Sequence, residues 1–287
     1  MNPDAIKYRI NSLSKKKGVP AQKMWEKFFR EQFLYLLSTT KYIHHFCLKG
    51  GALLELTYTS MNRSTKDIDF LGIGINSNVD EVTHIFQEIC ASQPENQLVL
   101  FNIDMTKPPE VLHHDGLYEG VRLYLFAKLK EANTQHTIKI EIGFGDVVTP
   151  HYQTIQVDTL IGITDFAMLS YTNETVIAEK FYAMITLADK NSRMKDFYDV
   201  YFLLKDNLYS ESTLNHAILN TFKNRQFVYL TTPYIFGNEI TTNNVFLERW
   251  ASFLAKNALP PAPSFGTVVT FIVKQLSPIY QSLEHKL

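Results

Sequence analysis

Lys49-Gly-Gly-Ala-Leu-Leu54, followed by Arg63-Ser-Thr-Lys-Asp-Ile-Asp-Phe70, is the stretch that decides the fold of this chain. The second block enters an apolar strand at Asp67. Side chains alternate between the two faces of a strand, so Asp67 and Asp69 point one way while Ile68 and Phe70 point into the core. Two carboxylates this close repel each other unless a cation or proton lies between them, and hard oxygen ligands suit Mg²⁺ together with substrate phosphates. The pair therefore predicts a metal site.

The glycine pair Gly50-Gly51 lies between a predicted strand and a predicted helix. Backbone amides in such a turn can face an anion, because no Cβ blocks the approach and the helix N-terminus favours negative charge. A Gly-Gly pair alone is more often a simple turn. The order of glycine turn, helix and Asp-x-Asp strand, however, predicts a phosphate-binding turn beside the metal site.

A third carboxylate on a neighbouring strand is expected if two metal ions are held. In the segment Thr137-Ile-Lys-Ile-Glu-Ile142, the isoleucines alternate with Lys139 and Glu141. Glu141 therefore stands on the polar face of a core strand and is the candidate, with Asp146 as the second choice. The alternative is a half-exposed strand that carries an ordinary Lys139/Glu141 pair.

Composition sets limits on the class of protein. The chain has 287 residues, is 45% hydrophobic and contains 20 Phe and 15 Tyr, which is enough for a sizeable core. No apolar run is long enough to span a bilayer and the first residues lack a signal-peptide pattern, so we expect a cytoplasmic protein with no membrane partner. The two cysteines, Cys47 and Cys90, have no metal-binding spacing and are expected to be buried thiols.

Charge is distributed unevenly along the chain. Residues 1–30 carry eight Lys or Arg residues against Asp4 and Glu26, although the net charge of the whole chain is only −1. A basic end can bind a polyanion such as RNA. The alternative is an ordinary solvated face.

The residue pattern predicts an α+β protein. A mixed β-sheet domain with flanking helices is expected over residues 1–165, and a helical bundle domain over residues 166–287. Strands are expected near 46–49, 68–73, 97–105, 120–129 and 136–144. Helices are expected in the first forty residues and near 52–59, 79–91, 173–189, 194–205 and 265–283.

Four blocks together resemble the nucleotidyltransferase superfamily, and more narrowly the AbiEii/AbiGii toxin family of bacterial toxin–antitoxin systems. Two are the blocks quoted above, and the others are Glu174-Thr-Val-Ile-Ala-Glu-Lys-Phe181 and Arg193-Met-Lys-Asp-Phe-Tyr-Asp-Val200. They occur in the family's order and cover roughly residues 45–205. Residues 206–287 match no block and are the expected place for partner specificity.

The resemblance implies a nucleotidyltransferase fold and a role for each matching residue. The implied metal ligands, for Mg²⁺ with Mn²⁺ as an alternative, are Asp67, Asp69 and Glu141. The implied nucleotide-binding residues are Gly50, Gly51, Arg63, Thr65, Lys180 and Arg193. The implied catalytic residues are Asp67, Asp69, Glu141, Lys180 and Asp196, with Lys180 reaching the triphosphate of an NTP.

Simpler interpretations exist for several of these residues. Lys180 also fits a surface lysine whose stem follows apolar surface, Asp196 a helix cap beside Asp199, and Arg63 or Arg193 an ordinary salt bridge. The chain departs from the family at Ala52, where many relatives carry a hydroxyl residue. Backbone amides are therefore expected to bind the phosphate, with Ser64 or Thr65 as an alternative source of a hydroxyl. Glu141 stands where an Asp is common.

The function implied is a Mg²⁺-dependent, toxin-like transfer of a nucleoside monophosphate from an NTP to an RNA acceptor, with the 3′ end of tRNA favoured. A cognate antitoxin protein is an expected partner, and growth arrest the expected outcome. Two alternatives remain open. The same residues could serve a kinase or nucleotidyltransferase that modifies a partner protein, or a catalytically inactive protein that binds a nucleotide or a partner.

Overall fold

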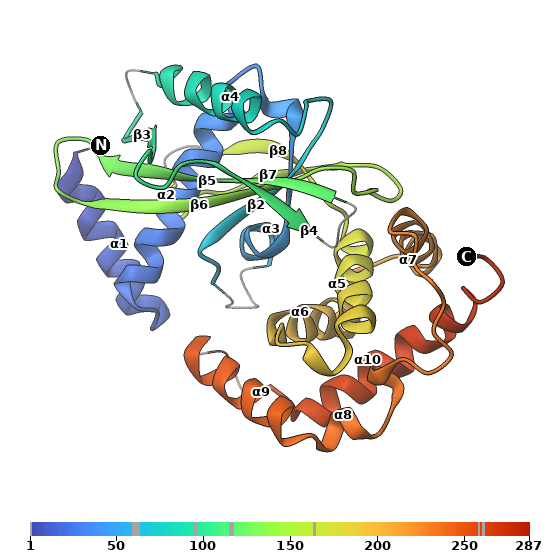
Figure 1. Ribbon diagram of the computed structural model, residues 1–287. Helices are drawn as coiled ribbons and strands as arrows, with labels where there is room; N and C mark the ends of the chain where they lie inside the picture. Colours follow the sequence, from blue (N-terminus) through green and yellow to red (C-terminus); the bar gives the residue numbers. More distant parts are fainter. Residues whose placement is uncertain are drawn as a thin grey trace. The chain divides into compact units, whose positions relative to one another are not determined.

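A computed structural model describes residues 2–58, 64–94, 97–114, 118–162, 165–257, 259 and 262–287 (Figure 1). The chain divides into two compact units. The sheet unit comprises Met1–Thr59, Ser64–Gly145 and Gln153–Ser170, and the helical unit comprises Ser60–Arg63, Asp146–Tyr152 and Tyr171–Leu287. The two units are therefore interleaved in sequence. The domain ranges 1–165 and 166–287 stay a prediction.

One mixed sheet organises the sheet unit. Its strands are β1 (Phe46–Lys49), β2 (Asp67–Gly72), β3 (Val99–Ile103), β4 (Glu110–His114), β5 (Tyr118–Leu129), β6 (Gln135–Gly143), β7 (Gln153–Val157) and β8 (Phe166–Ser170). The order is β3-β5-β6-β2-β1-β8-β7, with β4 also paired to β5. The pairs β2–β6 and β1–β8 are parallel, and the remaining pairs are antiparallel. The predicted α+β architecture, with one mixed sheet and flanking helices, is confirmed.

Five strands lie within two residues of their predicted bounds, whereas β4, β7 and β8 were not predicted. Each of these three strands has only five residues. In β8 the buried positions alternate with half-buried ones, but a five-residue alternation among turn signals is too short to distinguish from a connecting loop.

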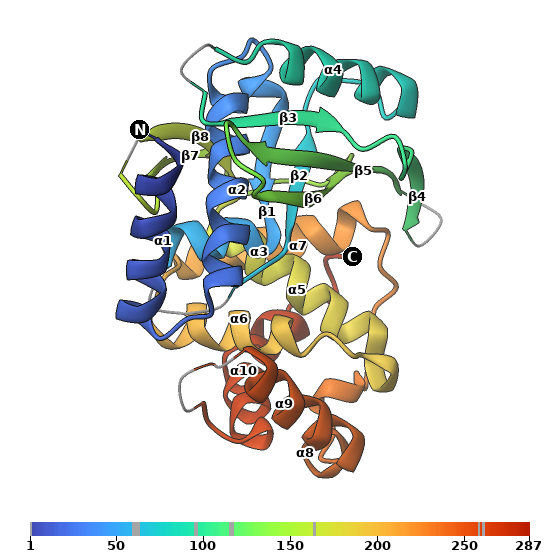
Figure 2. The ribbon, with the colours of Figure 1, turned by 90° about the vertical axis from the view of Figure 1, so that its left-hand side faces the viewer.

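Four helices belong to the sheet unit: α1 (Pro3–Lys17), α2 (Ala21–Ser38), α3 (Gly50–Thr57) and α4 (Val79–Ala91). Helix α1 begins where the Asn2 side chain accepts a hydrogen bond from the Ala5 amide, and it ends at Gly18, which has a left-handed φ of 63°. Helix α2 runs across the strands (Figure 2) and contacts β3, β6 and β8.

The core of the sheet unit is aromatic. Phe33 of α2 lies 6.0 Å from Phe86 of α4 and 5.6 Å from Phe101 of β3, measured between ring centroids. Phe46 of β1 contacts both Phe86 and Phe70. All five rings are fully buried. Apolar burial therefore anchors one face of β1 and β2, which leaves alternate side chains of β2 for the opposite face.

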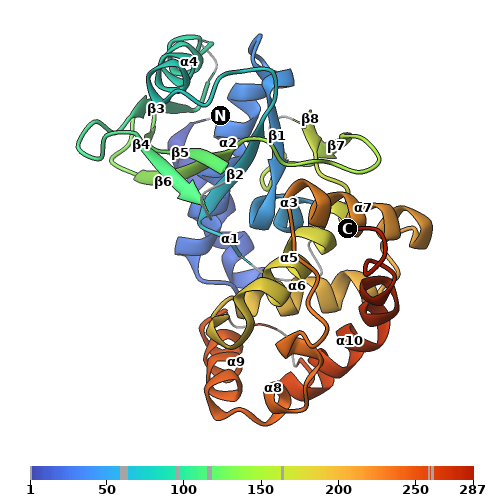
Figure 3. The ribbon, with the colours of Figure 1, turned by 45° about the vertical axis from the view of Figure 1, so that its right-hand side comes forward.

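The helical unit contains α5 (Asn173–Leu187), α6 (Met194–Lys205), α7 (Glu211–Asn224), α8 (Glu239–Thr242), α9 (Asn244–Asn257) and α10 (Phe265–Gln281). Helix α5 packs against α6 and α7, and α10 packs against α6 (Figure 3). Contacts among Phe181, Phe222 and Tyr280 join α5, α7 and α10. Among the described residues, none of the helices combines the length and apolar character needed to cross a membrane.

Candidate functional site

The Asp-x-Asp pair lies at the start of β2. Ile68 and Phe70 are fully buried, whereas Asp67 and Asp69 are half-buried, as the predicted alternation requires. The side chain of Asp67 is 37% exposed, so its carboxylate can reach a solvent-borne ion. Both aspartates therefore stand on the polar face of the sheet.

The structure gives a reason for glycine at position 50 that the sequence did not reveal. Its φ is +65°, in the left-handed region, and it begins helix α3. A Cβ at this position would overlap Asp69 Oδ2 and would lie 2.9 Å from Asp69 Cγ. Glycine therefore allows the Asp69 carboxylate to approach the N-terminal end of α3, where the helix dipole favours negative charge. Gly51 follows as a buried residue in the first turn.

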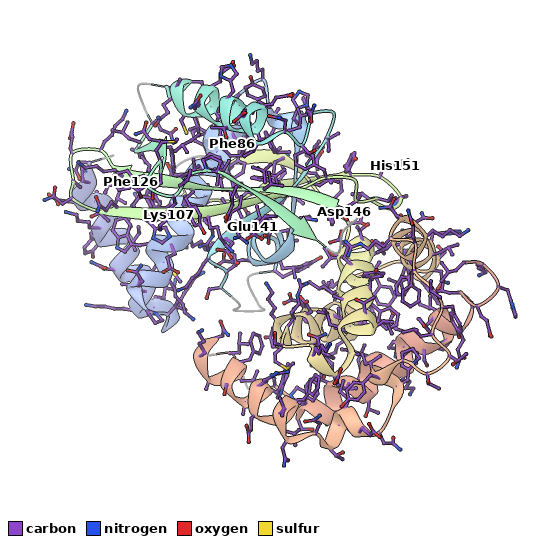
Figure 4. The ribbon with its side chains drawn as sticks, in the orientation of Figure 1. Phe86, Lys107, Phe126, Glu141, Asp146 and His151 are labelled. Carbon is purple, nitrogen blue, oxygen red and sulfur yellow. The ribbon has the colours of Figure 1, made fainter. Side chains whose placement is uncertain are left out.

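Glu141 lies directly opposite Asp69 in the parallel pairing of β2 with β6, so the expected third carboxylate is on the neighbouring strand. Its Oε1 accepts hydrogen bonds from Arg122 Nε at 2.9 Å and from Lys139 Nζ at 3.0 Å. Lys139 Nζ also lies 2.9 Å from Asp67 Oδ2. The Lys139/Glu141 ion pair of the simpler interpretation is thus present, and Lys139 also connects it to Asp67. Glu141 is labelled in Figure 4.

These cations change the acidity of Glu141. Partial burial opposes ionisation, but hydrogen bonds and charge attraction from Lys139 and Arg122 outweigh it, and the pKa of Glu141 falls below its ordinary value. Glu141 is therefore ionised at neutral pH. Arg122 was not singled out from the sequence. Its position between buried Val121 and Leu123 on β5 is the signal that could have placed it on the polar face.

The turn before β2 is only partly described. Ser64 and Thr65 are half-buried, while Arg63 lies outside the described residues. Ala52, in the first turn of α3, is buried. The phosphate-binding roles of Arg63 and Thr65 stay predictions.

A second cluster of charges lies inside the helical unit. Lys180 of α5 is 8% exposed, and its Nζ lies 2.5 Å from Asp196 Oδ1 and 2.9 Å from Asp199 Oδ2 of α6. Both aspartates are fully buried. The interpretation of Lys180 as a snorkelling surface lysine is wrong, because its ammonium is buried with the rest of the side chain. Asp196 is not a helix cap either, since Arg193 occupies that position.

Arg193 completes this cluster through its Nε, which lies 2.7 Å from Asp196 Oδ2. Burial would raise the pKa of Asp196, but attraction to Lys180 and Arg193 is stronger and holds that pKa below its ordinary value. The structure therefore brings together three of the predicted residues, Lys180, Arg193 and Asp196, within the helical unit. It brings together Gly50, Gly51, Asp67, Asp69 and Glu141 within the sheet unit.

Asp146, the second choice for a third carboxylate, belongs to the helical unit. Asp146 is labelled in Figure 4. Its Oδ1 lies 2.9 Å from Arg225 Nη2, and its Oδ2 accepts a hydrogen bond from the Tyr171 hydroxyl at 3.2 Å. Its carboxylate is therefore engaged by a structural network of that unit.

Comparison with known proteins identifies the family. The sequence profile described as nucleotidyl transferase AbiEii toxin, type IV toxin–antitoxin system, matches residues 32–270. The chain belongs to the AbiEii family. The match extends beyond residue 205, so most of the segment that the four blocks left unassigned also belongs to the family pattern. Membership places the chain among nucleotidyltransferase toxins and implies a cognate antitoxin.

Two solved structures share the fold. One is a protein from H. pylori described as a candidate nucleotidyltransferase, with 15% identity and a TM-score of 0.51 over 94% of this chain and 99% of the other. The second is JHP933 from Helicobacter pylori, with 16% identity and a TM-score of 0.51 over 92% and 94% of the two chains. No curated protein sequence matches this AbiEii chain.

The donor atoms of this AbiEii chain indicate which of its residues suit a metal ion. The carboxylate oxygens of Asp67 and Asp69 are hard donors of the kind that Mg²⁺ and Mn²⁺ take, and they share one face. Within the described ranges, no group of three or more His, Cys, Asp or Glu side chains is arranged to hold a metal ion. The two aspartates fit such an ion, and Glu141 as its third ligand stays a prediction.

Proposed function

We propose that this AbiEii-family chain transfers a nucleoside monophosphate from an NTP to a hydroxyl of RNA, with the 3′ end of tRNA as the favoured acceptor. Asp67 and Asp69 hold Mg²⁺, with Mn²⁺ as the alternative. The observation that carries the proposal is the pair of aspartates on the polar face of β2, with Asp69 packed against Gly50 at the start of α3.

Different residues of the chain would bind the metal ion and the phosphates. A divalent cation bound to the aspartates supplies positive charge for the phosphates and for the attacking hydroxyl. The first amides of α3, at Gly50 and Gly51, would donate to phosphate oxygens. Thr65 would add a hydroxyl donor from the turn before β2, in place of the side chain missing at Ala52.

Lys180 would bind a triphosphate oxygen as a compact positive charge. Its ammonium contacts two carboxylates, at 2.5 Å and 2.9 Å, in a cluster where Lys180 is only 8% exposed. Because of this burial, a phosphate would reach the ammonium by displacing one of the carboxylates. Asp196 would hold Lys180 and Arg193 together, because its two carboxylate oxygens bind one cation each.

The basic N-terminal helix is the surface proposed for RNA. Lys15, Lys16 and Lys17 lie in the last turn of α1, and all three are exposed. Lysines on an exposed helix end contact phosphates without reading a base sequence. Binding through them should weaken steeply as salt concentration rises, because it releases counterions.

The test is the identity of the labelled product. The full chain is incubated with Mg²⁺, total RNA and each labelled NTP in turn. We expect label to enter RNA, and Asp69→Asn to remove it. Asp165→Asn, which neutralises an exposed aspartate of the same unit, is the matched control and should not change labelling.

Other outcomes separate the alternatives. Label in protein would favour a kinase or nucleotidyltransferase that modifies a partner. Mg²⁺-dependent NTP binding without any label would favour an inactive binding protein. RNA labelling that persists in Asp69→Asn would refute the assigned metal site.

A further inference from the structure

The polar face of the sheet carries a row of charged residues that are neighbours in register across five strands. From β4 to β1 the row reads Glu110, Arg122, Glu141, Asp69 and Lys49. Lys139 and Asp67 are also neighbours in register, two residues before Glu141 on β6 and Asp69 on β2, and we count them as part of this row. Side chains on one face of adjacent strands are close enough to interact directly. The aspartate pair is therefore part of a row that also includes fixed cations.

Glu141 is anchored by the cations of this row. Arg122 Nε lies 2.9 Å and Nη2 2.8 Å from its Oε1, while Arg122 Nη1 is held 2.8 Å from Glu110. Lys139 Nζ lies 3.0 Å from the same Oε1. The Nε and Nη2 atoms of Arg122 thus converge with Lys139 Nζ on one oxygen of Glu141, and such charge-assisted contacts are stronger than neutral hydrogen bonds. A metal ion would have to displace these cations before it could use that oxygen of Glu141.

Lys139 lies between two of the three predicted metal ligands. Its Nζ is 2.9 Å from Asp67 Oδ2 and 3.0 Å from Glu141 Oε1. The ammonium therefore places a positive charge between carboxylates of two neighbouring strands. An ammonium has three N–H donors, and these two contacts use two of them. The third can donate to a phosphate oxygen of a bound nucleotide.

We propose that Lys139, positioned by Glu141 and Arg122, supplies the second positive charge of this site in place of a second metal ion. The chain then binds a single divalent cation, at Asp67 and Asp69. Lys139 contacts the nucleotide phosphate, and Glu141 is a positioning residue for Lys139 instead of a metal ligand. This inference rests on the proposed function, because it assigns a role within the same site.

The test counts bound metal ions. Mn²⁺ is titrated into the full chain in the presence of a non-hydrolysable NTP analogue, and free Mn²⁺ is followed by electron paramagnetic resonance. We expect one Mn²⁺ per wild-type chain. Lys139→Met removes the competing charge, so a second Mn²⁺ should bind or the first should bind roughly tenfold more tightly. Lys139→Arg should keep a single ion, and Lys128→Met, which changes an exposed lysine of β5, is the matched control.

A second variant tests Glu141 without removing the lysine. Glu141→Gln should still bind one Mn²⁺, whereas Asp69→Asn should bind none. Two ions on the wild type, or a Lys139→Met titration identical to that of the wild type, would overturn the inference. Loss of Mn²⁺ from Glu141→Gln as complete as that from Asp69→Asn would also overturn it.

Failure of this inference can be told apart from failure of the proposed function. If Asp69→Asn loses Mn²⁺ but Lys139→Met behaves as the wild type, only the role of Lys139 is refuted. If the wild type binds no Mn²⁺, the metal site itself is refuted and the role of Lys139 falls with it.

Discussion

Replacing Gly50 by alanine tests whether the close approach of Asp69 to the start of α3 organises this site. An alanine at Gly50 must adopt a φ of +65°, and its Cβ must overlap Asp69 Oδ2. Rotation of the Asp69 carboxylate removes only part of the conflict. The new Cβ would still lie 3.1 Å from Asp69 Cβ, which is fixed to the backbone of β2.

Two contributions set the expected loss of stability. The left-handed backbone costs alanine roughly 1–2 kcal/mol. Crowding against a strand that is paired on both sides should add about 1–3 kcal/mol. We therefore expect Gly50→Ala to lower the free energy of unfolding by roughly 2–5 kcal/mol in total.

Gly162→Ala is the matched control. Gly162 has a φ of +60°, and a Cβ there would meet no described atom within 4 Å. Its alanine variant should therefore show the backbone contribution alone, roughly 1–2 kcal/mol. The difference between the two variants isolates the conflict with Asp69.

The assay combines stability and function. Urea unfolding followed by circular dichroism gives the loss of stability, and Mn²⁺ titration and RNA labelling report on the site. A displacement of Asp69 by about 1 Å should reduce labelling roughly 100-fold. If Gly50→Ala and Gly162→Ala lose equal stability, and Gly50→Ala keeps its Mn²⁺ affinity and labelling, the reasoning about Gly50 is wrong.

Three further changes have expected outcomes. Lys180→Met removes the ammonium that contacts Asp196 and Asp199, although Arg193 still contacts Asp196. It should cost about 3–5 kcal/mol in urea unfolding, whereas a loss under about 1 kcal/mol would contradict the buried cluster. Burial raises the pKa of Glu31 from 4.5 to about 7, although attraction to Lys27 and a hydrogen bond from the Leu160 amide oppose the rise. The contribution of Glu31 to the free energy of unfolding is therefore full below pH 4.5 and is lost as pH rises through 7. Glu31→Gln should remove this loss, on the order of 3 kcal/mol, in unfolding measured from pH 5 to pH 8. Glu131→Gln, which changes an exposed glutamate, should keep the loss. Equal pH dependence in Glu31→Gln and the wild type would refute the raised pKa of Glu31. Joint replacement of Lys15, Lys16 and Lys17 by glutamate should weaken RNA binding and flatten its salt dependence in filter binding, and an unchanged salt slope would exclude α1 as the RNA surface.

Local patterns predicted the parts of this protein that depend on short segments. Alternation along residues 67–70 predicted which side chains of β2 are buried, because the two-residue period of a strand follows from backbone geometry. The same period placed Glu141 on the polar face of β6. The strands β4, β7 and β8 escaped prediction, because short strands are stabilised by their neighbours in the sheet more than by their own residues.

The partners of the charged residues could not be predicted in the same way. Lys139 followed the expected alternation, but only the parallel register of β2 with β6 places its ammonium between Asp67 and Glu141. Arg122 comes from β5, and its contact with Glu141 depends on a second register. Register is set by the pairing of whole strands, and no motif within one strand specifies it.

The amino-acid sequence by itself determined the family, through four blocks in order, and the faces on which Asp67, Asp69 and Glu141 stand. The tertiary structure decided what those residues touch. It set Asp69 against Gly50, buried Lys180 between Asp196 and Asp199, and joined Lys139 to the aspartate pair. The physical reason is that side-chain direction follows from local backbone geometry, whereas burial and charge pairing depend on residues that are distant in sequence and meet only when the sheet and the helices pack.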